Sequence, residues 1–160
     1  MQDFQEMVEE HQHRIYGFAL ALTGNHHDAE DVAQEAFIRA HRALGTYSEA
    51  RRRELKESAW LHKIALNVFR NRRRAEKVTV PIDAIAEPPA DGLSPERTSE
   101  LREALTRLPR RYREAVVLRH VQGLPYDEIS RLMEVPEGTL KSDVHRALKL
   151  LKEELHGADC

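Results

Sequence analysis

The chain has 160 residues, of which 41% are hydrophobic and 32% charged, and its formal net charge at pH 7 is −2. This length allows one domain or two small ones with real cores. No apolar run approaches the ~20 residues of a membrane span and no signal peptide opens the chain, so we expect a cytoplasmic protein. The single cysteine, Cys160, is the last residue, which excludes a disulfide framework or a cysteine zinc site within one chain.

The small net charge conceals a segregated one. Residues 1–50 carry 3 basic and 9 acidic side chains, whereas residues 51–77 carry 10 basic and 3 acidic ones. A local basic field can bind nucleic acid in a protein of near-neutral overall charge. Residues 51–77 are therefore a candidate nucleic-acid surface, with an ordinary solvated basic helix as the alternative.

Three helices are predicted in the first unit, residues 1–77. Apolar residues at i, i+3, i+4 and i+7 indicate an amphipathic helix that ends at Gly24. The same spacing indicates a second helix with Asp28 as N-cap and Gly45 at its end. A polar, arginine-rich loop is expected over residues 45–57, and Ser58 is expected to cap a third helix that ends in the basic sequence RNRRRAEK.

A proline-rich stretch separates this unit from a second one. Residues 78–95 lack helical periodicity, which predicts a linker. In residues 96–160, two helices are followed by a short helix, a tight turn and a longer helix, which is the helix-turn-helix arrangement with residues 139–152 as recognition helix. The predicted fold class is all-α: two small helical domains joined by a flexible linker, the C-terminal one a four-helix helix-turn-helix domain.

The recognition helix has the residues that a DNA groove requires. Backbone N–H groups and a hydroxyl at its start suit a phosphate, and polar side chains lie opposite its apolar stripe. A helix-turn-helix pattern also occurs in proteins that do not bind DNA, so the pattern by itself is a moderate signal. The candidate residues are Gly138, Thr139, Lys141, Ser142, His145, Arg146 and Lys149.

Both units resemble one protein family. The sequences LPRRYREAVVLRHVQGLPYDEIS and VPEGTLKSDVHRAL are similar to the −35 reader of bacterial RNA polymerase sigma factors of the extracytoplasmic-function (ECF, sigma-70 family) group. The first unit resembles the same family independently, through ALTGNHHDAEDVAQEAFIRAHRAL and AWLHKIALNVFRNRRR. The resemblance implies a dissociable subunit that binds core RNA polymerase, recognises the −10 and −35 promoter elements and promotes DNA melting.

The resemblance also implies a polymerase-binding segment in the first unit. DVAQEAFIRAHR matches the segment that docks on the clamp helices of the largest subunit, β′, and the β subunit is a further expected contact. These positions lie off the apolar stripe of their helix, although an ordinary solvated helix face would look the same. The residues implied are Asp31, Gln34, Glu35, Ile38 and Arg42.

AWLHKIALNVFRNRRR matches the helix that opens and reads the −10 element. By resemblance, Trp60 lies near the melted strand, with a simple core role as the alternative, and Asn67 lies near the pocket for a flipped-out base. Cationic side chains would hold the backbone. No bond is broken, so this is binding work and not catalysis. The −10 residues implied are Trp60, His62, Lys63, Asn67, Arg70 and Arg73.

The chain departs from the family pattern at four places. His62 stands where the family often has Tyr or Phe, so stacking would be weaker or pH-sensitive. The loop over residues 45–57 is longer than usual and its arginine-rich stretch lacks the usual aromatic residue. Glu134 replaces a common glycine, which suggests a different turn geometry. Asp143 replaces a basic residue, and it could pair with Arg146, accept from a cytosine amine, or repel phosphate.

Other functions have less support in the sequence. The histidines at 11, 13, 26 and 27 with Asp28 and Glu30 show no metal-ligand spacing, and no phosphate loop or catalytic triad pattern occurs, so we expect no metal, no cofactor and no enzyme. The alternatives are a free-standing helix-turn-helix regulator, a metal-dependent hydrolase, and a sigma-like protein that has lost melting. Expected partners are core RNA polymerase and promoter DNA; an anti-sigma factor is a further candidate, and no membrane insertion is expected.

Overall fold

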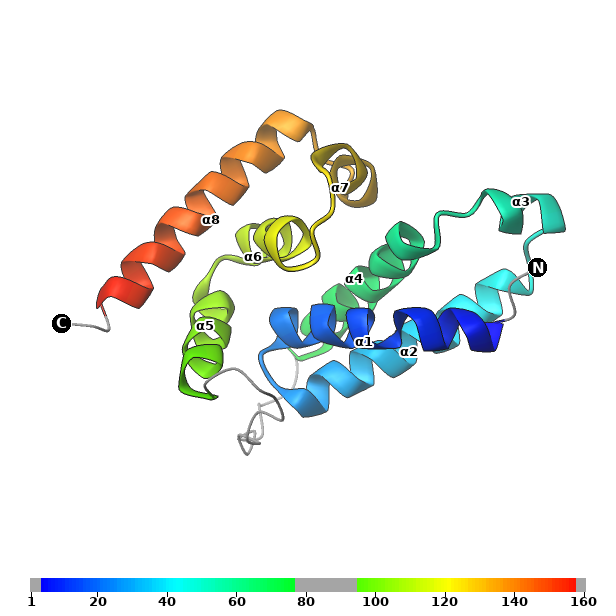
Figure 1. The fold of residues 1–160 in the computed structure, drawn as a ribbon, viewed down its shortest axis with the longest axis horizontal. Coiled ribbons are helices and arrows are strands. Elements are labelled where there is room, and N and C mark those ends of the chain that lie inside the picture. The colour runs from blue at the N-terminus through cyan, green and yellow to red at the C-terminus, as the bar shows by residue number, and fades with distance from the viewer. Residues whose placement is uncertain (1–3, 77–94, 158–160) are drawn as a thin grey trace.

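A computed structural model describes residues 4–76 and 95–157, which form only helices and the turns between them (Figure 1). The predicted linker, apart from Pro95, and Cys160 lie outside these residues. No helix of the described part is long and apolar enough to cross a membrane. The first unit contains α1 (Phe4–Thr23), α2 (His26–Leu44), α3 (Glu49–Glu54) and α4 (Glu57–Glu76). The second contains α5 (Pro95–Arg107), α6 (Arg110–Val116), the π-helix η1 (Val117–Val121), α7 (Tyr126–Met133) and α8 (Glu137–Gly157).

Helices α1, α2 and α4 pack on one another as a three-helix unit. The turn between α1 and α2 corrects the predicted cap, because Asn25 and not Asp28 is the N-cap of α2. The Asn25 side-chain oxygen accepts from the Asp28 backbone N–H at 2.8 Å, and its amide donates to the Asp28 carboxylate at 2.7 Å. This pairing satisfies an orphan N–H of the first turn, and the cap of the helix lies three residues earlier than predicted.

The predicted loop over residues 45–57 contains a short helix, α3. Ser48 caps it by accepting from the Arg51 backbone N–H at 3.2 Å. The guanidinium of Arg52 donates to the Leu44 carbonyl, with Nε at 3.0 Å, and so ties α3 to the end of α2. Because α4 begins at Glu57, Ser58 lies inside that helix and is not its cap.

The second unit forms the predicted helix-turn-helix from α7 and α8. Glu134 adopts the left-handed conformation that glycine favours, with φ 59°, so the turn between α7 and α8 keeps a glycine-type geometry. The recognition helix runs from Glu137 to Gly157 and is longer than the predicted 139–152. Apolar residues of this unit that stay exposed include Leu101 at 42%, Val121 at 50% and Leu148 at 42%.

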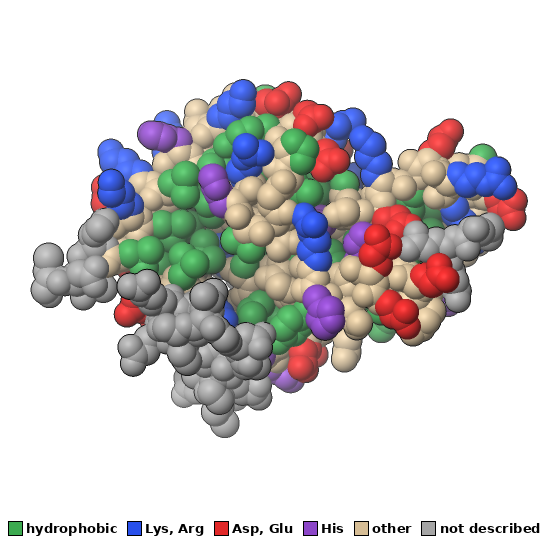
Figure 2. Space-filling view, in the orientation of Figure 1, with side chains coloured by type: hydrophobic (Ala, Val, Ile, Leu, Met, Phe, Trp, Pro, Cys, Tyr) green, Lys and Arg blue, Asp and Glu red, His purple; other side chains and the backbone are tan. Residues whose placement is uncertain are grey.

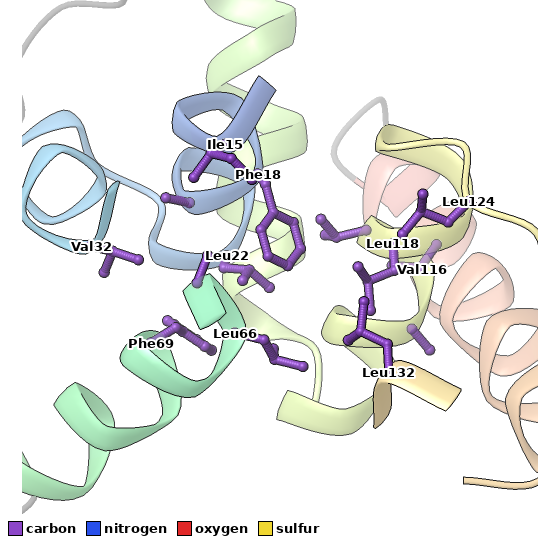
Figure 3. Packing of buried hydrophobic residues seen from close by; sticks show 14 of the residues in the cluster. Ile15, Phe18, Leu22, Val32, Leu66, Phe69, Val116, Leu118, Leu124 and Leu132 are labelled. Atoms are coloured by element: carbon purple, nitrogen blue, oxygen red, sulfur yellow. The ribbon is translucent and has the colours of Figure 1, made fainter. Parts of the chain in front are cut away.

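The two units share one continuous apolar core (Figure 3). Phe18 and Leu22 of α1 and Leu66 of α4 are buried, and they lie on the side of the first unit that meets Val116 and Leu118 of the second. Burying such side chains stabilises the folded chain by about 25 cal/mol for each Å² of apolar area removed from water. The units are therefore packed against each other, and residues of α4 that face this contact are covered.

Candidate nucleic-acid interface

The groove-facing side of the recognition helix α8 is open to solvent. Leu140, Val144 and Ala147 of α8 are buried, so the opposite side of the helix faces outward. Two aromatic residues border this side: the Lys141 ammonium lies 5.7 Å from the Tyr126 ring centre, and the Arg146 guanidinium lies 3.5 Å from the Tyr112 hydroxyl. All seven residues predicted to contact the −35 element are exposed: Gly138, Thr139, Lys141, Ser142, His145, Arg146 and Lys149.

Asp143, the acidic residue in this helix, faces α6 and not the solvent. Its side chain is only 6% exposed, and a carboxylate oxygen lies 3.3 Å from the guanidinium of Arg111 in α6. None of the three roles considered from the sequence included this partner. A buried carboxylate that pairs with a residue of another helix is not placed to accept from a base amine. Its negative charge is balanced by the guanidinium of Arg111.

Four of the predicted −10 residues lie along one side of α4, because they are three or four residues apart: Trp60, Lys63, Asn67 and Arg70. Lys63 and Asn67 are exposed, whereas Trp60 is partly buried against Tyr47, with ring centres 6.0 Å apart. The Arg51 guanidinium lies 3.8 Å from the centre of the Tyr47 ring. The arginine-rich stretch itself holds no aromatic residue, but Tyr47 at the start of the same loop places a ring beside Trp60. Its position just before the arginines was the available signal.

His62 is buried and Arg70 is only partly exposed, and both contact the second unit. The His62 side chain is fully buried, with its ring 4.9 Å from the Phe18 ring. Its Nδ1 lies 2.6 Å from the Ser58 carbonyl, and its Nε2 lies 2.8 Å from the Gln122 side chain of the second unit. Burial lowers the pKa of His62 from its usual value, more than its hydrogen bonds to Gln122 and to the Ser58 carbonyl raise it. In this arrangement His62 is covered and cannot stack on a base, so its predicted contact with the −10 element stays a prediction.

Arg70 forms a paired contact with the second unit. Its Nε and Nη2 donate to the two carboxylate oxygens of Glu114 at 3.1 and 2.7 Å. The Glu114 side chain is 1% exposed and that of Arg70 is 27% exposed, so the pair is largely removed from water. The hydrogen bond to Glu114 raises the pKa of Arg70. The side chain of Arg73, the last of the predicted −10 residues, lies outside the described side chains.

Further contacts fasten the second unit to α1. Arg113 of α6 donates to the Leu22 carbonyl at 2.9 Å, and Arg14 of α1 donates to the backbone carbonyl of Gln122. An open groove of about 250 Å³ also lies between the units, bordered by Trp60 and Lys63 of α4 and by α7. The sequence contained no signal for these partners, because they lie far apart along the chain.

The predicted polymerase-binding residues form a stripe along α2. Their spacing of three or four residues places Asp31, Gln34, Glu35, Ile38 and Arg42 on one face. Ile38 is 45% exposed, and with Phe37 and Gln34 it borders a shallow groove of about 590 Å³ between α1 and α2. Ile38 and the partly buried Phe37 give this groove an apolar part with polar residues around it, the arrangement of a core and rim at protein interfaces.

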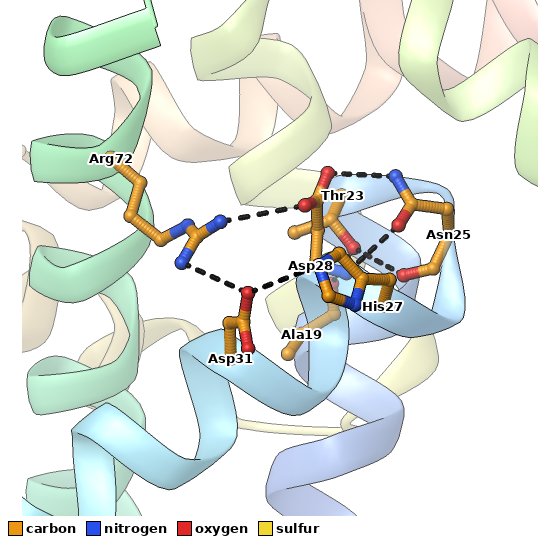
Figure 4. A network of polar contacts seen from close by, with 7 residues as sticks. All are labelled: Ala19, Thr23, Asn25, His27, Asp28, Asp31 and Arg72. Carbon is orange, nitrogen blue, oxygen red and sulfur yellow. Dashed lines mark hydrogen bonds and ion pairs between the residues drawn. The ribbon is translucent and has the colours of Figure 1, made fainter. Parts of the chain in front are cut away.

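A polar network links this stripe to α4 (Figure 4). The Arg72 guanidinium of α4 lies 3.4 Å from the Asp28 carboxylate and 3.5 Å from that of Asp31. His27 lies 3.6 Å from Asp31 on the same helix. The network fixes the start of α2 against α4, so the polymerase-binding and −10 stripes are held in one orientation.

Charged side chains gather at the end of the first unit where α3 projects, with arginines of α3 near acidic residues of α1 (Figure 2). Close by, the structure brings together a group of potential metal ligands that was not predicted: His11 Nε2 lies 3.2 Å from Glu57 and 4.0 Å from Glu10. The histidine–carboxylate contacts account for this geometry without a metal ion.

Two helical units, the second with an open recognition helix, define a helix-turn-helix protein, and comparisons with known proteins specify its family. The family described as "Sigma-70 region 2" matches residues 7–79, and "Sigma-70, region 4" matches residues 98–151. The ECF RNA polymerase sigma factor SigW of Bacillus subtilis is 31% identical over 95% of this chain and 88% of its own length. SigE of Mycolicibacterium smegmatis is 36% identical over 97% of this chain, which spans 62% of that relative.

A solved structure has the same fold. The sigma factor RpoE of Bartonella quintana, in complex with the anti-sigma factor NepR, superposes with a TM-score of 0.79 at 27% identity over 98% of both chains. The chain therefore belongs to the ECF RNA polymerase sigma factors, as its sequence motifs predicted.

Proposed function

We propose that this chain is a dissociable sigma subunit that binds core RNA polymerase, reads the −10 element with residues 1–77 and the −35 element with residues 96–160, and promotes DNA melting. One observation carries the proposal. Between Gly138 and Lys149, the only acidic residue is buried against α6, so the exposed polar side chains of that stretch are all cationic, hydroxyl or imidazole groups. Such a surface suits phosphates and the acceptors of guanine in a major groove.

The α2 stripe is the proposed polymerase contact. Ile38 supplies an apolar anchor, while Gln34, Glu35 and Arg42 supply polar groups around it. Asp31 is held by Arg72 and therefore orients the stripe as well as contributing to it. An anti-sigma factor is a further proposed partner, since the related RpoE was solved in complex with one.

The −10 site combines stacking and charge. Tyr47 and Trp60 offer a pair of aromatic faces beside exposed Lys63 and Asn67, and a base released from the duplex can stack on such a platform. Capture of the base compensates an unstacking cost of a few kcal/mol. Arg70 can join this site only after the second unit has moved off α4 and released it from Glu114. Promoter opening therefore requires the two units to separate.

Run-off transcription with core RNA polymerase on a genomic promoter library tests the proposal. We expect promoter-specific transcripts with the chain and none from core polymerase alone. The double variant Gln34→Ala/Glu35→Ala should lose them. The matched control, Gln5→Ala/Glu9→Ala, removes the same two chemical groups from the exposed side of α1, where they hydrogen bond to each other, and should keep transcription.

The rival function is a free-standing helix-turn-helix regulator, which would hold specific duplex DNA without polymerase. Retention of DNA by the chain alone, with no transcript at any promoter, would establish the rival and exclude the sigma role. The α2 stripe argues for the sigma role, because a free-standing regulator does not need an apolar anchor such as Ile38 on that helix.

A further inference from the structure

We propose that Arg111, which lies outside the recognition helix, contacts a phosphate of the −35 element, and that the buried carboxylate of Asp143 positions it for this role. The proposal rests on the proposed reading of the −35 element by α8. It gives a function to the acidic residue that is out of place in a DNA-binding helix.

The carboxylate of Asp143 lies deeper below the protein surface than the guanidinium of Arg111. The Asp143 carboxylate is 6% exposed, whereas the Arg111 side chain is 61% exposed, and the two groups are 3.3 Å apart. The negative group therefore faces the contact between α6 and α8, and the positive group lies between it and solvent. A phosphate that approaches from outside meets the guanidinium first.

Arginine has the donors needed for both contacts. Its guanidinium carries five N–H donors in a planar fork, and one Nη group faces Asp143. Because the side chain is 61% exposed, donors outside this pair are open to solvent, where a phosphate can reach them. Pairing with a fixed carboxylate also reduces the side-chain freedom that arginine would otherwise lose on binding DNA.

The position of Arg111 places it beside the groove-facing side of α8. Its guanidinium carbon lies 5.2 Å from the centre of the Tyr112 ring, and the hydroxyl of the same tyrosine lies 3.5 Å from Arg146. Both arginines therefore border Tyr112, one from α6 and one from the groove-facing side. Asp143 lies three residues before Arg146, on the flank of that side, so Arg111 is held at its edge where the phosphate backbone runs.

The sign of one substitution distinguishes this role from simple repulsion. Asp143→Asn removes a negative charge from a DNA-binding helix, so an acid that merely repelled phosphate would give tighter binding once it was gone. A positioning acid gives the opposite result, because Arg111 keeps its charge while its charged partner is replaced by the weaker, neutral acceptor of Asn. The matched control is Glu154→Gln, the same change on the same helix, in a pair with Arg107 of α5 at 2.6 Å.

The experiment measures binding of holoenzyme, made from core polymerase and the full chain, to a promoter found by run-off transcription, over a range of KCl concentrations. We expect Asp143→Asn to weaken binding about three- to tenfold, and Arg111→Gln, which keeps a donor for Asp143, to lower the slope of log K against log salt by about 1. Glu154→Gln should change binding less than twofold. Thermal unfolding of each variant shows whether the second unit stays folded.

Tighter binding by Asp143→Asn, or an unchanged salt slope in Arg111→Gln with the unit folded, would overturn the inference. Those results would leave the sigma role intact, because wild-type holoenzyme would still bind the promoter. Absence of promoter binding by the wild type would instead refute the proposed function.

Discussion

Glu114 is the residue through which closure of the two units can be tested most directly. It accepts both hydrogen bonds of Arg70, at 2.7 and 3.1 Å, and its side chain is 1% exposed. A second arginine, Arg110, lies 3.7 Å away on α6 itself. Replacing Glu114 with Gln keeps the shape of the side chain and one acceptor, but it removes the charge and the second acceptor. It leaves every residue of the proposed DNA-binding surfaces unchanged.

The expected loss follows from this geometry. A hydrogen bond to a charged group contributes about 1.5–3 kcal/mol, and breaking a buried ion pair costs about 3–5 kcal/mol when the remaining charge stays buried. The Arg70 side chain is 27% exposed and regains water when the units separate, which favours the lower figures. We therefore expect Glu114→Gln to weaken the association of the units by about 2 kcal/mol, which is about a thirtyfold shift toward the open form.

The single tryptophan, Trp60, reports the separation. It borders the groove that the first unit forms with Glu128 and Arg131 of α7, so acrylamide should quench its fluorescence more strongly in the open form. The control is Glu103→Gln, in an exposed pair with Arg107 at 3.9 Å, where about 0–1 kcal/mol is expected. Quenching and thermal unfolding of Glu114→Gln identical to those of the wild type would show that the pair does not hold the units together.

Three further predictions concern single positions. Glu134→Gly should raise the unfolding free energy of the second unit by about 0.5–1 kcal/mol, since it relieves a left-handed residue at φ 59°; a lower melting temperature would contradict this. Acidification should open the units, because burial lowers the pKa of His62 in the closed form. The neutral imidazole of His62 favours closure at a pH above the ordinary histidine pKa, and this contribution is lost as the pH falls through the lowered pKa. Trp60 quenching that does not rise between pH 7.5 and 5, or that rises equally in His62→Gln, would refute that assignment. Gly24→Ala should cost about 1–2 kcal/mol in thermal unfolding, because φ is +84° and a Cβ would lie 2.5 Å from Thr106; Thr106→Ser, which removes that methyl, should restore only part of it.

The family, the helices and the exposed side of α8 could all be predicted from the sequence. Helical periodicity reports which residues of a helix share a face, so the seven predicted −35 residues were placed on the exposed side of α8 without coordinates. Local signals were less reliable at helix ends. Asn25 and Asp28 both suit an N-cap, and only the observed backbone, with Asn25 extended at φ −148°, shows which one serves.

Tertiary structure decided which polar residues are available. Arg70 and Glu114 are 44 positions apart, and His62 and Gln122 are 60 apart, yet each pair lies within hydrogen-bonding distance. Periodicity places His62 and Arg70 on particular sides of α4 but does not indicate what covers those sides. Asp143 is the same case, since its partner Arg111 lies on another helix. The sequence by itself therefore determined the family and the local helices, because both depend on residues near one another along the chain. The contacts that cover the −10 helix and bury the acid of the recognition helix depend on how distant helices pack, and only the folded chain specifies that.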